Sequence, residues 1–169
     1  MPLRDRFTLA GMVEQQLSLQ ERATLLEKSR LGSGLGWQEL QSLAAYFDAW
    51  RADAGTYVCR QGEQSDFMCM LFQGRVRIVK EDLQHTSKEI ASVGPGQVVG
   101  EMALIDGEPR SASVIVTTPV LLLVLDEDHC TQMADQMPRL WAKLLLQLAR
   151  TMSKRLRQTS GVLAEYLSS

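Results

Sequence analysis

The sequence lacks the features of membrane and secreted proteins. No stretch approaches the roughly 20 consecutive apolar residues that a membrane-spanning helix requires. Residues 1–16 carry scattered charges and lack the apolar run of a secretory signal. The net charge of −2 is too small to indicate a nucleic-acid or membrane partner. We therefore expect a cytoplasmic protein without membrane contact.

Residues that hold metals or carry out catalysis are also scarce. The three cysteines, Cys59, Cys69 and Cys130, are an odd number and show no CxxC spacing, which favours buried thiols in a reducing compartment. The two histidines, His85 and His129, stand isolated in the sequence, which favours solvated or helix-capping roles. We expect no metal site, no catalytic residue, no cofactor and no enzymatic activity.

The chain does contain the apolar residues of one domain, with helical signals near its start. Its 169 residues, 45% of them hydrophobic, are enough to bury a core. Ser18 followed by Glu21 is a capping-box signature for the start of a helix. Apolar residues then recur at helical spacing from Trp37 to Phe47. Residues 1–50 are therefore predicted to form an N-terminal helical segment.

From residue 51 to residue 126 the sequence changes to short candidate strands separated by Gly-rich and Pro-rich turns. Regularly spaced strands of this kind predict a β-barrel or a sandwich. In "RVRIVK" the alternation places Val76 and Ile78 on one face. The run "VLLLVL" at 120–125 does not alternate, so we expect it to be buried on both faces or covered by a helix. The candidate strands are "TYVCR", "FMCMLF", "RVRIVKE", "KEIASV", "SASVIVT" and "VLLLVL".

Residues 127–169 are predicted to form C-terminal helices. Asp126 is a suitable N-cap for a helix to about Gln136, and Pro138 is well placed as the first residue of a longer one. We expect Gly161 to stop or kink that helix. Its apolar residues fall on two stripes, one able to pack on the barrel and the other able to meet a partner helix. The first stripe holds Leu140, Leu144, Leu148 and Leu156, and the second holds Trp141, Leu145, Met152, Thr159, Val162 and Tyr166.

The stretch "GEMALIDGEPRSASV" at 100–114 carries more polar residues than a plain turn needs. A helix that starts near Gly100 would offer free amides and a positive dipole end to an anion. Glu101 is an acceptor suited to a sugar hydroxyl, and Arg110 is a planar fork of donors suited to a phosphate. Together they fit a ribose that carries a phosphate. The alternative is a Glu101–Arg110 ion pair across a surface loop, worth about 0–1 kcal/mol.

The same stretch closely resembles the phosphate-binding cassette of the cyclic nucleotide-binding domain family. That pattern is Gly-Glu-apolar-Ala-Leu, a short variable turn, and then Arg-small-Ala. The resemblance extends from about Leu35 to Leu156 and includes the glycines of "AGTYVCRQGEQSD" and "LFQGRV". It implies an α+β fold, in which residues 51–126 form an antiparallel jelly-roll β-barrel, a double-stranded β-helix, with the cassette at 94–114. N-terminal helices and a long C-terminal helix flank the barrel.

The resemblance also implies roles for individual residues. Glu101 would accept a hydrogen bond from the ribose 2′-OH and Arg110 would pair with the cyclic phosphate, so that both side chains face the ligand and not the core. Ser111 resembles the residue of the bacterial catabolite activator, which prefers cAMP, although a serine hydroxyl also suits the guanine amino group of cGMP. The remaining ligand contacts implied by the resemblance are Gly100, Met102, Ala103 and Ala112.

A further pair on the long helix resembles the residues with which the catabolite activator reads adenine. Thr159 and Ser160 form this Thr-Ser pair. Counted from Pro138, however, they lie about one helical turn further along than the pattern expects. Arg155 or Leu156 is the alternative at the position that closes the pocket.

The resemblance implies a receptor that is not an enzyme and binds a cyclic nucleotide, with cAMP as the expected ligand. The ligand would move the C-terminal helix and so regulate an effector protein that the sequence does not identify. The alternative is a scaffold that keeps the barrel without the nucleotide and acts only in protein interactions. Transcription factors of the family continue into a helix-turn-helix, which is missing before Ser169, so we expect a stand-alone member without sequence-specific DNA binding.

The long helix carries two further signals. A homodimer is expected through Leu145, Leu148, Met152, Thr159 and Tyr166, whose spacing is close to alternating steps of three and four residues. Between 138 and 160 the helix also has six basic residues and no acidic one. This face is either solvated, a docking surface for an acidic partner, or a weak and salt-sensitive nucleic-acid contact. The basic residues are Arg139, Lys143, Arg150, Lys154, Arg155 and Arg157.

Overall fold

The computed structural model describes residues 1–168 and begins with short helices. These are α1 (Leu3–Leu9), α2 (Leu19–Glu27) and α3 (Trp37–Ala44), with the two-residue strand β1 (Val13–Glu14) between the first two. The capping box at the start of α2 is confirmed: Ser18 Oγ accepts from the Glu21 amide at 3.2 Å, and Glu21 Oε2 accepts from the Ser18 amide at 2.7 Å.

The helical part ends earlier than the expected boundary at residue 50. Helix α3 stops at Ala44, and strand β2 (Asp48–Ala52) begins four residues later. In β2, Trp50 lies opposite Leu122 of a distant strand. Residues 48–52 form a strand because they pair with β7, and the helical pattern of the local sequence does not reveal this pairing.

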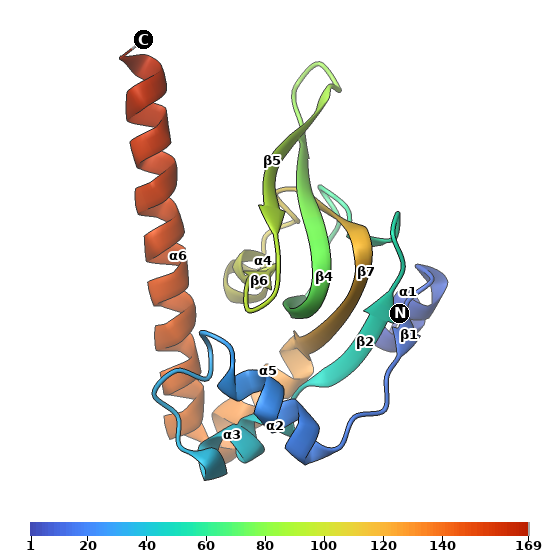
Figure 1. Ribbon diagram of the computed structural model, residues 1–169, viewed down its shortest axis with the longest axis vertical. Coiled ribbons are helices and arrows are strands. Elements are labelled where there is room, and N and C mark those ends of the chain that lie inside the picture. The colour runs from blue at the N-terminus through green and yellow to red at the C-terminus, as the bar shows by residue number, and fades with distance from the viewer. Residues whose placement is uncertain (169) are drawn as a thin grey trace.

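The remaining strands build one antiparallel, barrel-like sheet, which confirms the expected fold class. They are β3 (Tyr57–Cys59), β4 (Phe67–Glu81), β5 (Ser87–Val93), β6 (Val98–Val99) and β7 (Ser113–Asp126). The hydrogen-bonded order is β1-β2-β7-β4-β5, with β3 paired to β7 and β6 paired to β4. In Figure 1 the long strands β4 and β7 curve side by side through the middle of the molecule.

Strands β4 and β7 each join two of the expected short strands. The breaks predicted at "QG" and "TP" are bulges and not turns, because the register between β4 and β7 shifts on either side of Gly74. Gly74 has φ of 76°, and a Cβ atom there would lie 2.1 Å from the carbonyl oxygen of Pro119. Only glycine permits this approach, so the two strands continue past each other with a bend.

The run at 120–125 is buried on both faces, as predicted. Leu123 and Leu125 pack against the core that the barrel shares with α2, α3 and the C-terminal helices. Val120, Leu122 and Val124 face the second core, inside the barrel, where Phe7 of α1 also lies. Strand β7 therefore separates two hydrophobic cores.

Two helices close the chain, α5 (Glu127–Gln136) and α6 (Pro138–Leu167). Asp126 caps α5 by accepting from the His129 amide at 2.9 Å, as predicted. The expected stop or kink at Gly161 is wrong, since α6 is helical without interruption to Leu167. An exposed glycine within a helix costs only about 1 kcal/mol relative to alanine, which is not enough to end α6 at Gly161.

The two halves of α6 differ in their packing. Leu140, Leu144 and Leu148 are buried in the core that the barrel shares with α2 and α3. Leu156, expected on the same stripe, is 69% exposed. Leu148 was also expected in a dimer seam, but it is fully buried within the monomer. From Leu156 to Ser168 every side chain is exposed. In Figure 1 this half of α6 extends away from α2, α3 and α5 to the C-terminus. Across residues 1–168, no helix is both long and apolar enough to cross a bilayer.

Candidate functional site

The stretch at 100–114 forms a compact turn around the short helix α4 (Glu101–Asp106). Gly100 precedes α4 in the left-handed conformation, with φ of 80°. A Cβ atom at this position would lie 2.3 Å from Arg110 Nη1. Glycine is thus required both by the backbone conformation and by the close approach of the arginine.

Glu101, the first residue of α4, is 2% exposed and is held by a residue of α6. Arg155 donates from Nη1 to Glu101 Oε1 and from Nη2 to the carbonyl oxygen of Val98. The two ion-paired residues are 54 positions apart in the chain. The residue expected to accept from a ribose hydroxyl is therefore also the point where α6 is fastened to the barrel.

Arg110 differs from the expectation that it faces away from the core. Its side chain is 4% exposed, and its guanidinium donates to the carbonyl oxygens of Gly100 at 2.7 Å and Phe67 at 2.5 Å and to Ser65 Oγ. The guanidinium carbon also lies 4.5 Å from the centroid of the Phe67 ring. All of these partners are neutral, and within residues 1–168 no carboxylate lies within 4 Å of the guanidinium. Buried positive charge without a counter-ion favours the binding of an anion.

The surface ion pair between Glu101 and Arg110, which was the alternative to a ligand site, is not formed. Both side chains are buried, and the ion-pair partner of Glu101 is Arg155. The two residues are linked only indirectly, because Arg110 donates to the carbonyl oxygen of Gly100, next to Glu101.

A turn at residues 61–66 braces the cassette, and the sequence reasoning did not assign these residues to the site. The Arg110 amide donates to the Glu63 carbonyl at 2.9 Å, and the Gly62 amide donates to the Arg110 carbonyl at 2.8 Å. Gln64 Nε2 donates to the Gly107 carbonyl at 2.7 Å. The signal that could have found this turn is the "QGEQSD" segment, which already formed part of the family resemblance.

The other predicted site residues fall into two groups. Ala103 and Ala112 are buried beside Glu101 and Arg110, whereas Met102 is 49% exposed and Ser111 is exposed. Thr159 and Ser160 are exposed on α6, and within residues 1–168 neither makes a hydrogen bond to the cassette. Arg155, one of the two alternatives for the residue that closes the pocket, contacts Glu101 of the cassette.

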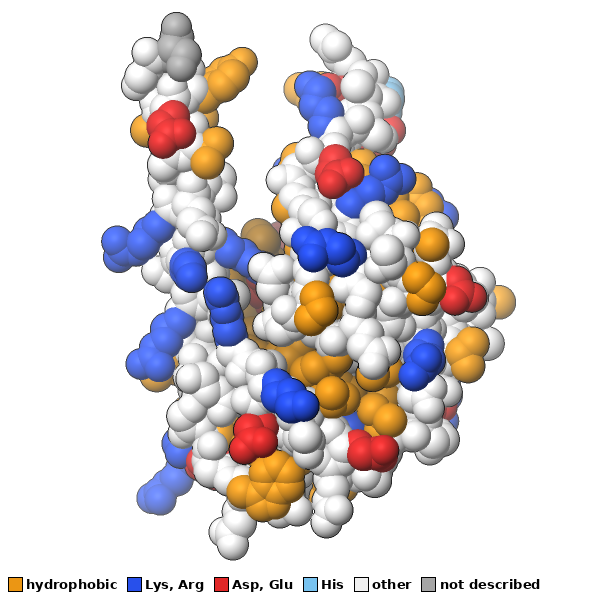
Figure 2. All heavy atoms as spheres, in the orientation of Figure 1, with side chains coloured by type: hydrophobic (Ala, Val, Ile, Leu, Met, Phe, Trp, Pro, Cys, Tyr) orange, Lys and Arg blue, Asp and Glu red, His pale blue; other side chains and the backbone are white. Residues whose placement is uncertain are grey.

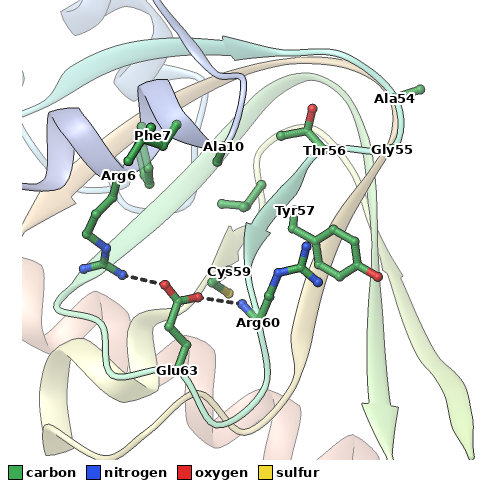
Figure 3. Close-up of a pocket in the computed structure, with 12 residues that line it drawn as sticks. Arg6, Phe7, Ala10, Ala54, Gly55, Thr56, Tyr57, Cys59, Arg60 and Glu63 are labelled. Atoms are coloured by element: carbon green, nitrogen blue, oxygen red, sulfur yellow. Dashed lines mark hydrogen bonds and ion pairs between the residues drawn. The ribbon is translucent and has the colours of Figure 1, made fainter.

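A cavity lies away from the predicted site residues, between α1 and the segment that contains β3. It has a volume of about 690 Å³ and is shown in Figure 3. Glu63 bridges its two sides, accepting from Arg6 Nη2 at 3.0 Å and from the Arg60 amide at 2.9 Å. The guanidinium of Arg60 stacks on the Tyr57 ring, 3.6 Å from its centroid. Two residues of the cavity wall contact the cassette: the Glu63 carbonyl accepts from the Arg110 amide, and Cys59 pairs with Val114.

Metal-ligating residues do not converge at any point in residues 1–168. The structure there holds no group of three or more His, Cys, Asp or Glu side chains able to bind an ion. All three cysteines are buried free thiols, and burial raises the pKa of Cys130 to about 12. His129 Nδ1 lies 2.8 Å from Asp126 Oδ1, and this contact raises the pKa of the imidazole.

Comparisons with curated proteins give relatives of several kinds. The chain is 33% identical over 120 residues to the Pycsar effector protein XpPycTIR of Xanthomonas perforans, covering 70% of this chain and 38% of that protein. It is 28% identical over 125 residues to the Cyclic AMP receptor protein of Thermus thermophilus, covering 74% of this chain and 58% of that one. The chain thus spans less than two thirds of either relative.

Solved structures of similar fold come from the same group of proteins. A cyclic nucleotide-binding domain from Methylobacillus flagellatus superposes with a TM-score of 0.81 and 27% identity, covering 90% of this chain and 88% of that one. The Catabolite Activator Protein of Thermus thermophilus has a TM-score of 0.72 and 27% identity, covering 80% of this chain and 62% of that one. Residues 50–137, just over half of the sequence, match the pattern of the cyclic nucleotide-binding domain. The chain therefore belongs to the cyclic nucleotide-binding domain family.

Proposed function

We propose that the protein is a receptor for a cyclic nucleotide, without catalytic activity of its own, and that it signals through the position of α6. The observation that carries the proposal is the position of Glu101. This carboxylate is both the expected acceptor for the ribose 2′-OH and the ion-pair partner of Arg155 on α6. A ligand that binds Glu101 acts directly on the contact that fastens the helix.

The link between ligand and helix is a competition for one buried carboxylate. A ribose hydroxyl that donates to Glu101 replaces or weakens the charged hydrogen bond from Arg155. Because every side chain from Leu156 to Ser168 is exposed, no buried packing within this described part of α6 opposes its movement. The ligand therefore shifts the helix by binding one of its positions better than the other.

Arg110 supports the proposal from the phosphate side. Its buried guanidinium has only neutral partners, so the negative charge of a cyclic phosphate would compensate it. We propose that the phosphate lies between Arg110 and the backbone of Ser111 and Ala112. Gly100, Met102 and Ala103 then contact the ribose side of the ligand. Ser111 leads us to favour cAMP over cGMP.

We also propose that α6 forms a homodimer and that its movement regulates an effector protein. Seven positions follow alternating steps of four and three residues along the helix. All seven are at least partly accessible, and Leu156 and Tyr166 are 69% and 81% exposed. Such spacing favours a coiled-coil seam between two copies. With Leu148 buried, the seam consists of Leu145, Ala149, Met152, Leu156, Thr159, Leu163 and Tyr166.

The second candidate is a scaffold that binds no nucleotide. It is favoured by the internal pairing of both key residues, since Glu101 is already satisfied by Arg155 and Arg110 by three acceptors. In that case α6 is permanently fastened, and the fold serves only as a surface for other proteins.

Calorimetry and a distance measurement separate the two candidates. The purified protein is titrated with cAMP, cGMP and 2′-deoxy-cAMP, and spin labels on Leu83→Cys and Ala164→Cys report the separation of α6 from the barrel. Both positions are exposed, while the native cysteines are buried. We expect saturable binding, with cAMP tightest, and a changed label distance. Absence of binding to all three ligands would establish the scaffold, and binding without a distance change would contradict signalling through α6.

A further inference from the structure

A small basic cavity lies beside the contact between α6 and the cassette. Its volume is about 120 Å³, and its lining combines α6, β6 and the segment that follows α2. Arg30, Lys154 and Arg155 all line it, together with Gln97 and Gln158, and no acidic residue does so. Figure 2 shows Lys and Arg side chains along α6 bordering the groove between that helix and the barrel. We call this the Arg30–Lys154 cavity.

Two of the three cations in the cavity have no counter-ion. Arg155 is paired with Glu101, but within residues 1–168 neither Arg30 nor Lys154 has a carboxylate within 4 Å. Elsewhere on α6, Lys143 does find such a partner, Glu39 of α3, at 2.5 Å. Like charges that share a small cavity repel each other, and a bound anion reverses the sign of that interaction.

The cations are carried by rigid elements. Arg30 follows the buried Ser29, whose Oγ donates to the Leu26 carbonyl at 2.6 Å and accepts from the Gly32 amide at 3.2 Å. Lys154 lies less than two turns beyond the buried Leu148 on α6. The fold therefore fixes the backbone positions from which the two exposed side chains reach the cavity.

We propose that the Arg30–Lys154 cavity binds a small oxyanion, inorganic phosphate or pyrophosphate. The cavity is well below the roughly 300 Å³ that a drug-sized ligand needs, which excludes a whole nucleotide. Gln97 adds a neutral donor, because its Oε1 accepts from the Gly94 amide at 2.9 Å and its amide NH₂ remains available. A tetrahedral anion thus meets two cations and a neutral donor within one recess.

An anion bound in the cavity would be coupled to the nucleotide site through Arg155. Arg155 lines the cavity and also donates to Glu101, so an oxyanion attracts the same guanidinium that Glu101 holds. We expect the bound anion to weaken the Arg155–Glu101 pair and to strengthen binding of a ligand that needs Glu101. This coupling rests on the proposed function, whereas binding of the anion itself does not.

The test begins on the full chain without any cyclic nucleotide. Wild type is titrated with pyrophosphate, phosphate and chloride at constant ionic strength, by calorimetry and by amide chemical shifts of Gln97 and Lys154. We expect pyrophosphate to bind more tightly than phosphate and chloride not to bind. Arg30→Gln and Lys154→Gln should each raise the pyrophosphate Kd about threefold to tenfold. Arg157→Gln, which removes a charge one turn away on α6 but outside the cavity, should leave it unchanged.

Three results would overturn the site. These are equal shifts with chloride, equal weakening by Arg157→Gln, or tighter binding of a short single-stranded oligonucleotide that Arg157→Gln also weakens. The last would establish a diffuse nucleic-acid face in place of a cavity. A cAMP titration with and without pyrophosphate then tests the coupling alone. If pyrophosphate binds and cAMP does not, the proposed function fails and the oxyanion site stands.

Discussion

The two ends of the cassette hold their buried charges in different ways. Glu101, at the start of α4, is neutralised by a cation from another part of the chain, the C-terminal half of α6. Arg110, at the other end, donates to the neutral acceptors of Ser65, Phe67 and Gly100 and keeps its positive charge. Glu101 therefore connects the cassette to α6. Arg110 holds the cassette against its neighbouring segments and provides a positive charge without a counter-ion.

The largest loss of binding is expected from Arg110→Ala. We expect cyclic nucleotide binding to weaken by roughly 2–5 kcal/mol, because a desolvated phosphate loses its charged partner. The variant should also unfold more easily, by about 1–3 kcal/mol, since buried acceptors such as the Phe67 carbonyl lose their donor. Calorimetry with cAMP and urea unfolding measure the two effects. Arg77→Ala, which removes an exposed arginine from β4, is the control, and cAMP binding by Arg110→Ala as tight as in wild type would contradict the assignment.

A smaller effect on binding is expected from Glu101→Gln. The neutral amide keeps the shape of the side chain but loses the charge that strengthens hydrogen bonds from a ribose hydroxyl and from Arg155. We expect cAMP binding to weaken by about 1–3 kcal/mol, and binding of 2′-deoxy-cAMP, which has no hydroxyl to donate, to weaken less. Titration of both ligands into wild type and variant gives the comparison. An equal loss of affinity for the two ligands would contradict the assignment of Glu101 as the acceptor for the ribose 2′-OH.

Arg155→Ala is expected to change cAMP binding in the opposite direction. Without its competitor, Glu101 is free to accept from the ligand, so we expect cAMP to bind about threefold to tenfold more tightly. The spin-label distance between α6 and the barrel in the ligand-free variant should approach that of ligand-bound wild type. Arg157→Ala on the same helix is the matched control. Weaker cAMP binding by Arg155→Ala would show that Arg155 supports the ligand and does not compete with it.

The smallest effect is expected from an ion pair outside the cassette, His129 and Asp126. The hydrogen bond to Asp126 raises the pKa of His129 above its usual 6.5. For Asp126 partial burial favours the neutral acid, but the bonds from His129 outweigh it and lower the pKa below 3.8. The contribution of His129 to stability is therefore complete below pH 6.5 and is lost as the pH rises through its folded pKa. That of Asp126 is lost only as the pH falls below about 3.8.

Thermal unfolding between pH 5 and pH 8.5 measures the histidine effect. We expect His129→Gln to flatten the decline of stability above neutral pH, and His85→Gln, at the exposed β4–β5 turn, to leave it in place. A decline that persists in His129→Gln would assign it to another group.

The sequence predicted those features of the fold that depend on neighbouring residues. The cap residues Ser18 and Asp126, the proline at the start of α6 and the two-sided burial of 120–125 all follow from local chemistry. The glycine at residue 100, with Glu101 and Arg110 after it, was recognised because the whole pattern lies within a short segment.

What the sequence did not predict depends on contacts between distant segments. The strand β2 exists because it pairs with β7, and the burial of Arg110 depends on Ser65 and Phe67, more than forty residues earlier. The partner of Glu101 is a residue of α6 that the family pattern offered only as an alternative. No periodicity or spacing within one segment carries such information, because it arises only when the barrel closes.

The unbroken course of α6 has a mechanical consequence. A helix rises about 1.5 Å per residue, so Arg155 lies about 10 Å beyond the last buried leucine, Leu148, and Leu167 lies about 28 Å beyond it. If the helix turns about Leu148 as a stiff rod, a displacement of about 1 Å at Arg155 becomes about 3 Å at the tip. The geometry is that of a lever with a short input arm at the cassette and a long output arm toward the C-terminus.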